Sequence, residues 1–222
     1  MTGYYAERLS GERLQHCYDL APPRVRQYLE AEIIFVLERI RPSDLVLELG
    51  CGYGRVLERL ISRAGTVVGI DTSHDSLALA REKLGTTCHL AAMDAIAPGF
   101  PDGQFDRVVC IQNGISAFHA DQRQLLVEAT RVTRSGGTVL FSSYAEAFWD
   151  ARLHWFRLQS EQGLVGEIDE DATGNGIIVC KDGFQATTVG EKEFVNLVLA
   201  AGLSAQITEV DESSLFCEIE VP

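Results

Sequence analysis

The sequence predicts one α/β domain built on a doubly wound, mostly parallel sheet of seven strands, with helices on both faces and an antiparallel strand at the C-terminal end. Its length of 222 residues suits one sizeable domain. Between residues 44 and 144, short apolar runs alternate with helical stretches, as in successive βαβ units. Only the polar residues 211–213 separate the final apolar runs, 204–210 and 214–221. Because this linker is too short for a helical crossover, these two strands must pair antiparallel.

The first element is an amphipathic helix over residues 25–40. Val25, Leu29, Ile33 and Val36 recur near the helical period, and charged residues occupy the opposite side. Pro42 cannot continue the helix, and the apolar run that follows predicts a buried strand. From there we expect strands at 44–49, 66–70, 86–91, 105–111 and 138–144, with intervening helices at 54–63, 74–84 and 121–134.

The last third of the chain departs from this alternation. Residues 145–162 have a helical apolar pattern, and the following β-like runs with glycine-rich turns predict a small β-hairpin excursion. Residues 191–202 then form a helix that Gly202 ends. We therefore divide the single domain, 1–222, into four parts: 1–43, 44–144, 145–190 and 191–222.

The composition bounds the partners and the compartment. With 19 basic and 32 acidic residues the net charge is −13, and the basic residues are scattered, which disfavours a nucleic-acid partner. The six cysteines are far apart, without a CxxC pair or a histidine at ligand spacing beside them, so we expect no metal site, no disulfide framework and a reducing, cytoplasmic location. No apolar run reaches 18 residues and the N-terminus lacks a signal-peptide core, so we expect neither export nor a membrane span.

A glycine-rich turn follows the first predicted strand. Gly50, Gly52 and Gly54 alternate with other residues, and Glu48 stands two positions before the first of them. Glycines let the backbone turn sharply and approach a ligand closely, and the helix that follows begins with unpaired N–H groups. A dinucleotide fingerprint would place a third glycine at position 55, where this chain has Arg55.

The segment ELGCGYG, residues 48–54, resembles motif I of the class I, Rossmann-like methyltransferases that use S-adenosylmethionine. The resemblance covers roughly residues 25–144. It implies that Asp71, after the second strand, accepts the ribose hydroxyls, and that Asp94, after the third, accepts the adenine amino group. It assigns to the cofactor site Glu48, Gly50, Cys51, Gly52, Gly54, Asp71, Thr72, Met93, Asp94, Ala95, Ile111, Gln112 and Asn113.

Each of these positions also has a purely structural explanation. The glycines can serve a tight strand-to-helix turn, and Asp71 can cap the next helix, although Thr72 or Ser73 can do so instead. Asp94 can cap a turn, and Gln112 and Asn113 can be solvated loop residues.

The resemblance implies in-line methyl transfer to an acceptor, with S-adenosylhomocysteine as the product and with positioning as the main task of the protein. We expect a small-molecule acceptor, bound by residues 145–190 and the first 20 residues, with the N-terminal segment acting as a lid. His119 is the first candidate for a base, and the other candidates for a base or an acceptor contact are His154, Tyr144, Tyr4, Tyr5 and Tyr18. Four aromatic residues fit either a helical core or an acceptor pocket: Phe148, Trp149, Trp155 and Phe156.

Two other functions remain open at this point. A non-catalytic cofactor-binding or partner protein could keep the same fold, and a nicotinamide-dependent oxidoreductase uses a related sheet. The sequence carries no signal for the oligomeric state, or for O, N, C or S as the methylated atom.

Overall fold

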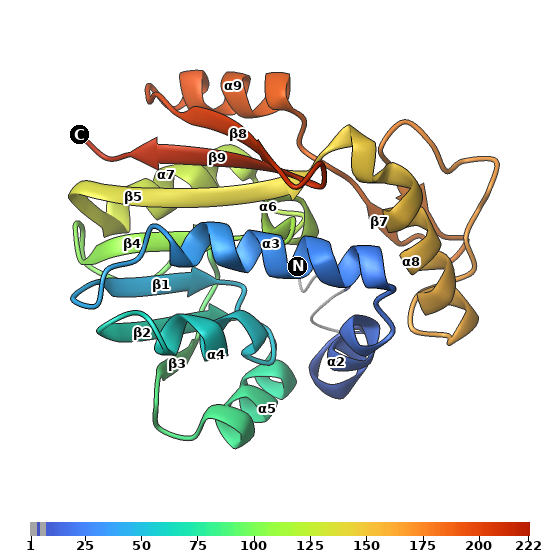
Figure 1. Cartoon of the computed structure of the whole chain (residues 1–222), viewed down its shortest axis with the longest axis horizontal. Coiled ribbons are helices and arrows are strands. Elements are labelled where there is room, and N and C mark those ends of the chain that lie inside the picture. The colour runs from blue at the N-terminus through green and yellow to red at the C-terminus, as the bar shows by residue number, and fades with distance from the viewer. Residues whose placement is uncertain (1–3, 5–7) are drawn as a thin grey trace.

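The computed structural model describes Tyr4 and residues 8–222, and it confirms the predicted sheet (Figure 1). Seven strands follow the order β3-β2-β1-β4-β5-β9-β8. The first five are parallel to one another, and β9 lies between β5 and β8, antiparallel to both. The strands are β1 (Leu45–Leu49), β2 (Thr66–Asp71), β3 (His89–Ala92), β4 (Phe105–Cys110), β5 (Thr133–Tyr144), β8 (Gln206–Val210) and β9 (Ser214–Glu220).

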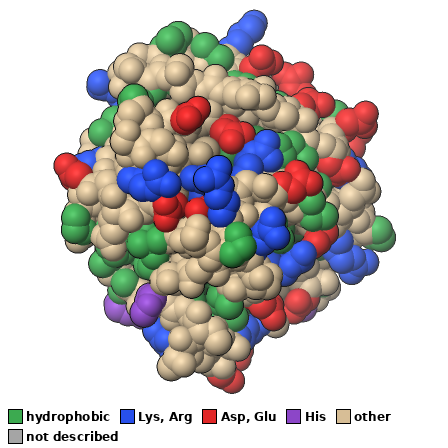
Figure 2. Space-filling model, turned by 60° about the vertical axis from the view of Figure 1, so that its left-hand side comes forward, with side chains coloured by type: hydrophobic (Ala, Val, Ile, Leu, Met, Phe, Trp, Pro, Cys, Tyr) green, Lys and Arg blue, Asp and Glu red, His purple; other side chains and the backbone are tan. Residues whose placement is uncertain are grey.

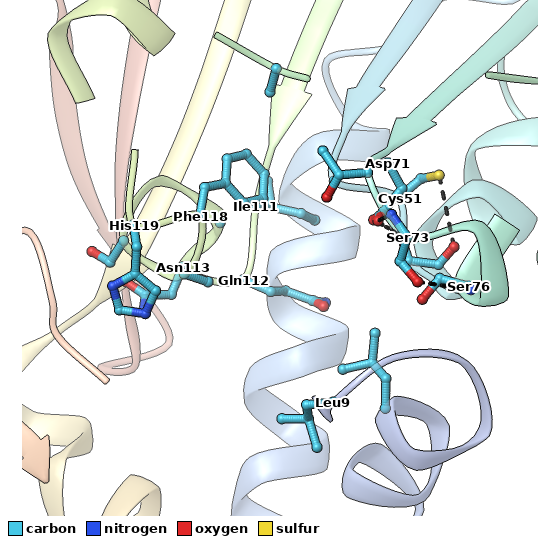
Figure 3. Close-up of a pocket in the computed structure, with 18 of the residues that line it drawn as sticks. Leu9, Cys51, Asp71, Ser73, Ser76, Ile111, Gln112, Asn113, Phe118 and His119 are labelled. Atoms are coloured by element: carbon cyan, nitrogen blue, oxygen red, sulfur yellow. Dashed lines mark hydrogen bonds between the residues drawn. The ribbon is translucent and has the colours of Figure 1, made fainter. Parts of the chain in front are cut away.

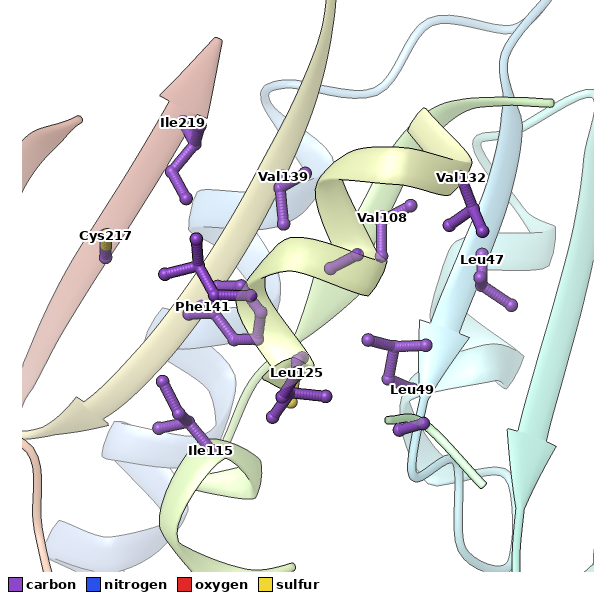
Figure 4. Packing of buried hydrophobic residues seen from close by; sticks show 14 of the residues in the cluster. Leu47, Leu49, Val108, Ile115, Leu125, Val132, Val139, Phe141, Cys217 and Ile219 are labelled. Atoms are coloured by element: carbon purple, nitrogen blue, oxygen red, sulfur yellow. The ribbon is translucent and has the colours of Figure 1, made fainter. Parts of the chain in front are cut away.

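Helices cover both faces of this sheet. On one face, α3 (Pro23–Leu37) and α4 (Arg55–Ile61) pack against side chains such as Val46 and Val109. On the other, α7 (Gln122–Val132) covers a core that includes Leu47, Leu49 and Val108 (Figure 4), and α9 (Glu191–Ala200) adds Phe194 and Val198 to the same core. Because alternate residues of β1 enter opposite cores, the whole strand has to be apolar apart from Glu48.

The helix and strand boundaries differ from the predicted ones where local contacts decide them. Helix α5 (His74–Leu84) begins as expected, because the Ser73 side chain accepts the N–H of Ser76. Helix α7 ends two residues earlier than predicted, and β5 begins at once, at Thr133 rather than at residue 138. A bulge in its pairing with β4 accommodates the extra residues, and Gly136 adopts a φ of +69° there.

The excursion lies beyond the carboxyl ends of the parallel strands (Figure 1). It contains a 3-10 turn at Glu146–Phe148, helix α8 (Trp149–Glu161) and the two short antiparallel strands β6 (Ile178–Val179) and β7 (Gln185–Ala186). The hairpin prediction is confirmed, although its strands have only two residues each.

Two helices were not predicted. Helix α2 (Gly11–Asp19) has only nine residues, of which Gly11 and Cys17 are buried, so its apolar pattern is too short to identify a helix from the sequence. The N–H of Gly11 donates to the Ser76 hydroxyl of α5 at 3.0 Å, which attaches α2 beside the carboxyl ends of the strands. Helix α6 (Gly114–Ala117) is a single turn.

The surface has no single region of positive charge in the view of Figure 2, where basic and acidic side chains are interspersed. Several of the basic groups are paired: Arg131 contacts Asp102 and Glu128, and Arg134 contacts Asp106. Within the described part of the chain, no helix combines the length and the apolar character that a membrane span needs.

Candidate functional site

A cavity of about 570 Å³ lies at the carboxyl ends of the parallel strands (Figure 3). Its walls are the turn after β1, the end of β2, the loops after β3 and β4, helices α2 and α8, and the residues around β7. This is the point where the strand order reverses between β1 and β4, the usual ligand position in an open α/β sheet. The volume falls in the range of small-molecule sites.

With one exception, the residues predicted to bind a cofactor line this cavity, and so does His119. The exception is Gly54, which does not reach the cavity. Its backbone has a φ of +87° at the start of α4, and a Cβ there would lie 2.7 Å from the Leu84 side chain. Gly54 is therefore explained by the packing of α4 against α5.

The turn after β1 needs its first glycine. The N–H groups of Gly50 and Cys51 both donate to the carbonyl of Ile70 in β2, and Gly50 has a φ of +73°. A Cβ at Gly50 would lie 2.4 Å from the Phe118 ring. The turn is thus held close to both neighbouring loops, and its backbone forms a wall of the cavity.

Asp71 fastens the same turn to the end of β2. Its two carboxylate oxygens accept the N–H groups of Gly52 and Ser73, each at 2.8 Å. Burial raises the pKa of Asp71, although these two hydrogen bonds oppose the shift. Since Ser73 caps α5, the helix cap does not explain Asp71, whose remaining lone pairs can accept donors from a ligand.

Two oppositely charged side chains in the cavity wall have atoms without a hydrogen-bond partner. Glu48 is 5 % exposed, and its Oε2 has no partner among the described residues. Burial raises its pKa to about 8, an effect that Arg55 opposes and Asp71 reinforces. The Nη2 of Arg55 also lacks a hydrogen bond within the described chain, while its guanidinium lies 4.6 Å from the centre of the Tyr18 ring. The sequence indicated Arg55 only as a departure from the dinucleotide pattern.

The loop after β4 has an unusual backbone. Gln112 and Asn113 adopt left-handed φ values of 57° and 63°. Asn113 is buried: its Nδ2 donates to the carbonyl of Thr187 at 2.9 Å, and its Oδ1 accepts the Ser143 hydroxyl at 2.8 Å. Asn113 is therefore not a solvated turn residue. Figure 3 shows Gln112 extending from this loop toward the middle of the cavity, and its Nε2 has no partner among the described residues.

Glu32 holds this loop from behind, a role that the sequence did not indicate. It is fully buried in α3, and its Oε2 accepts the N–H of Gln112 at 2.7 Å. Burial raises its pKa to about 7, against hydrogen bonds from Ser142 and from the Gln112 N–H, which lower it. The available signal was a carboxylate on the apolar face of the helix, between Leu29 and Ile33.

The remaining candidates differ in position. Asp94 lines the cavity while its Oδ1 accepts the N–H of Ile96 at 3.0 Å, so a turn cap and a ligand contact are compatible. His119 is exposed, with a φ of 49°. His154 is exposed on α8 and is not part of the cavity wall. Tyr4 donates to Asp182 instead, and Tyr5 lies outside the described residues.

The far wall of the cavity comes from α8 and α2. The inward face of α8 carries Arg152, Trp155, Phe156 and Gln159, spaced for one side of a helix, and the last three line the cavity. Tyr18 of α2 and Tyr144 at the end of β5 complete this wall. Two of the four aromatic residues in question, Phe148 and Trp149, pack in the hydrophobic core instead.

Residues 46–137 match the sequence profile of the family described as "Methyltransferase domain". A malonyl-(acyl-carrier protein) O-methyltransferase of Erwinia pyrifoliae is 36% identical over 113 residues, 50% of this chain and 42% of that protein. A 2-methyl-6-phytyl-1,4-hydroquinone methyltransferase of Synechocystis sp. is 30% identical over 134 residues, 55% of this chain and 42% of that protein. The chain thus spans less than half the length of these two relatives.

Among solved structures, geranyl diphosphate C-methyltransferase of Streptomyces coelicolor, in complex with Mg2+, geranyl diphosphate and S-adenosyl-L-homocysteine, superposes with a TM-score of 0.62. The match covers 89% of this chain and 80% of that chain at 11% identity. At this level of identity, the likeness shows the fold alone.

Proposed function

We propose that the chain is a class I, Rossmann-like methyltransferase that transfers a methyl group from S-adenosylmethionine to a small-molecule acceptor within the cavity. When bound, the cofactor supplies an electrophilic methyl group on a sulfonium. The acceptor's lone pair forms the new bond as the C–S bond breaks, and the electron pair of the broken bond stays on the sulfur. The residues of the chain bind the cofactor and the acceptor, orient them and exclude water from them.

One observation carries this proposal: Glu48 and Arg55 place an unpartnered carboxyl oxygen and an unpartnered guanidinium nitrogen in one cavity wall. Buried charged groups need partners, and a zwitterionic amino acid provides both at once. The methionine part of S-adenosylmethionine has an ammonium for Glu48 Oε2 and a carboxylate for Arg55 Nη2. The nicotinamide cofactors have no such pair, which weighs against the oxidoreductase alternative.

The other cofactor contacts follow from the positions of the wall residues. The Gly50–Gly52 backbone admits the methionine part closely, Asp71 accepts the ribose hydroxyls and Asp94 accepts the adenine amino group. Gln112 and Asn113 face the methyl group from the loop after β4, fixed by Glu32 and Thr187.

We place the acceptor between this loop and the inward face of α8. The wall there comes from Tyr18, Tyr144 and the excursion, which agrees with the proposed role of residues 145–190. The hydroquinone named for the Synechocystis relative is a small molecule, which supports an acceptor of that size. His119 stands at the exposed rim, where it can take a proton that a protic acceptor releases.

Binding of S-adenosylhomocysteine to Gly52→Val tests the cofactor site. Gly52 has a φ of +52°, and a Cβ there would lie 3.1 Å from Leu14, so a larger side chain has to displace the turn or enter the cavity. We expect the variant to lose at least tenfold in affinity by isothermal titration calorimetry, about 1.4 kcal/mol.

Gly202→Val is the matched control. Gly202 has a similar φ of +73° at the end of α9, a Cβ added there would have no neighbour within 4 Å, and the residue lies outside the cavity wall. Equal affinities in both variants would refute the site. Tight binding of NAD by the unmodified protein, without binding of S-adenosylhomocysteine, would favour the oxidoreductase alternative. Cofactor binding without methyl transfer to any acceptor in a labelled-cofactor assay would favour the non-catalytic one.

A further inference from the structure

The part of the cavity next to α8 differs chemically from the rest. We call it the acceptor chamber and define it by Tyr18, Tyr144, Trp155, Phe156 and Gln159. The charged or titrating groups of the described cavity wall lie elsewhere, at Glu48, Arg55, Asp71, Asp94 and His119. The chamber therefore has aromatic rings and an amide but no ionised side chain of its own.

The rings of the chamber are rigid and closely spaced. The centres of Tyr18 and Trp155 are 5.8 Å apart, and those of Trp155 and Phe156 are 6.1 Å apart. The Trp155 indole N–H already donates to the carbonyl of Cys17 at 2.8 Å, which fixes the ring against α2. Such walls suit a planar, largely apolar molecule.

The chamber does not fit a cationic acceptor. An aromatic cage binds an ammonium through free ring faces, but a guanidinium already lies over three of these rings, Tyr18, Tyr144 and Phe156. Arg152 lies 4.5 Å from the centre of the Tyr144 ring, and Arg55 lies 4.6 Å from that of Tyr18. A protonated amine would have to share those rings with an existing cation.

An anionic acceptor is also disfavoured. Burial raises the pKa of both Tyr18 and Tyr144, so their hydroxyls are neutral hydrogen-bonding groups at physiological pH. Arg55, which lines the cavity, is assigned to the cofactor carboxylate. Arg152, beside Tyr144, is outside the cavity wall and donates to the carbonyls of Gly176 and Ala186, so an anion in the chamber would lose its hydration without a direct counter-ion.

One polar group in the chamber is available for recognition. Gln159 is 3 % exposed, lines the cavity and makes no side-chain hydrogen bond to the described residues. A buried amide without a partner is costly unless a ligand satisfies it. It can both donate and accept, so it matches an uncharged group such as a hydroxyl or an amide.

From these features we propose that the acceptor is an uncharged, planar ring compound that offers a neutral polar group to Gln159. The proposal rests on the proposed function, which places the cofactor in the other part of the cavity. For an acceptor of this kind with a hydroxyl as its nucleophile, an O–CH3 bond forms, the S–CH3 bond breaks with its electron pair on sulfur, and the hydroxyl proton passes to His119 or to water at the rim.

Three probes of one shape separate charge from size: 4-hydroxybenzamide, 4-hydroxybenzoate and 4-hydroxybenzylamine. They share the ring and the hydroxyl, and at pH 7.5 they are neutral, anionic and cationic at the other end. Titration into the protein saturated with S-adenosylhomocysteine gives their affinities. We expect the neutral amide to bind at least about tenfold more tightly than either charged probe. Tighter binding of a charged probe, or binding of none of the three, would overturn the proposal.

Two variants test whether Gln159 contacts the neutral probe. Gln159→Leu should lower the affinity for 4-hydroxybenzamide about tenfold and leave the affinity for S-adenosylhomocysteine unchanged, which also shows that the variant is folded. Gln162→Leu, an exposed position at the end of the same helix, is the matched control and should change neither affinity. An unaltered amide affinity in Gln159→Leu contradicts the assigned contact. Failure of the unmodified protein to bind S-adenosylhomocysteine refutes the proposed function instead, so the two failures are distinguishable.

Discussion

Glu32 is a carboxyl group on a helix face that is otherwise apolar, and its contacts are polar groups of the loop after β4 and of β5. Its titratable or charged neighbours are Tyr18, Tyr28, Tyr144, Cys110 and Arg55. Burial raises the pKa of the four tyrosine and cysteine side chains, so Arg55 is the charged group among these five at neutral pH. The ionisation of Glu32 is therefore disfavoured in the native protein and unhindered in the unfolded chain.

This difference predicts how stability depends on pH. The pKa of Glu32 is about 7 in the native protein against 4.5 for an exposed glutamate. Between these values the native state binds more protons, so the contribution of Glu32 to stability falls as pH rises through that window and is constant above it. Glu32→Gln removes this dependence. From pH 5.5 to 8.5 the variant should gain stability relative to the unmodified protein, by about 2 kcal/mol, in urea unfolding.

Glu30→Gln is the control for this prediction. Glu30 lies on the same helix, but it is half exposed and paired with Arg59, which keeps its pKa below the ordinary value. Its effect on stability should be constant over the same pH range. The titration of Glu48 is common to all three proteins and cancels in the comparison. Parallel stability curves for Glu32→Gln and the unmodified protein would show that Glu32 does not titrate there.

Among single residues, the sequence predicted those that can be recognised by their spacing along the chain. Gly50, Gly52 and Asp71 follow from a strand, a turn and a second strand in order. Glu32 and Gln159 could not be assigned, because what matters about each is an environment created by a segment far away in the chain: Gln112 is 80 residues from Glu32.

At the scale of the element, α8 attaches the excursion to the sheet through Arg152. This side chain is 1 % exposed, donates to the carbonyls of Gly176 and Ala186 at 2.9 and 2.7 Å, and packs on the Tyr144 ring. One residue thus joins the helix, the loop before β6 and the end of β7.

Replacing Arg152 by Met should loosen the excursion. Three charge-assisted hydrogen bonds, to the carbonyls of Gly176, Ala186 and Thr187, are lost, so the free energy of unfolding should fall by about 3 kcal/mol. Limited proteolysis should cut faster within residues 166–186. Arg157→Met is the control on the exposed side of α8, where Arg157 pairs with the exposed Glu170, and it should change the stability little. Equal stability of the two variants would contradict this role for Arg152.

The elements that the sequence predicted well are those with an apolar period and clear ends. Helix α5 begins after its N-cap Ser73 and ends before Gly85, as the sequence predicted. Each of the seven strands of the large sheet was also predicted. Helix α2 could not be predicted, because its apolar pattern is too short and its position depends on α5 and α8. The early start of β5 depends on a bulge against β4, which local propensity does not encode.

At the scale of the whole molecule, all six cysteines are free and buried. Burial raises the pKa of Cys17 and Cys217 to about 12 and that of Cys180 to about 11, and the other three shift in the same direction. Because the thiolate is the reactive form, the native protein should react slowly with Ellman's reagent at pH 8, and six thiols should react in guanidinium chloride.

The positions of the thiols refine this prediction. Cys17 and Cys51 line the cavity, while the other four are outside its wall. Peptide mass spectrometry of partly labelled protein should therefore find these two modified first, and saturating S-adenosylhomocysteine should protect them. Rapid labelling of Cys110 or Cys217 in the native state would show that the sheet opens more readily than its packing indicates.

Two stretches of the chain line the cavity, and each would have to bind a different ligand. The walls proposed for the cofactor fall almost entirely within residues 46–137, the part that matches the methyltransferase family, whereas the acceptor chamber comes from Tyr18 and from residues 144–159 outside it. Under the proposed function, a change of acceptor requires new side chains at Tyr18, at Tyr144 and on α8, but none in the glycine turn.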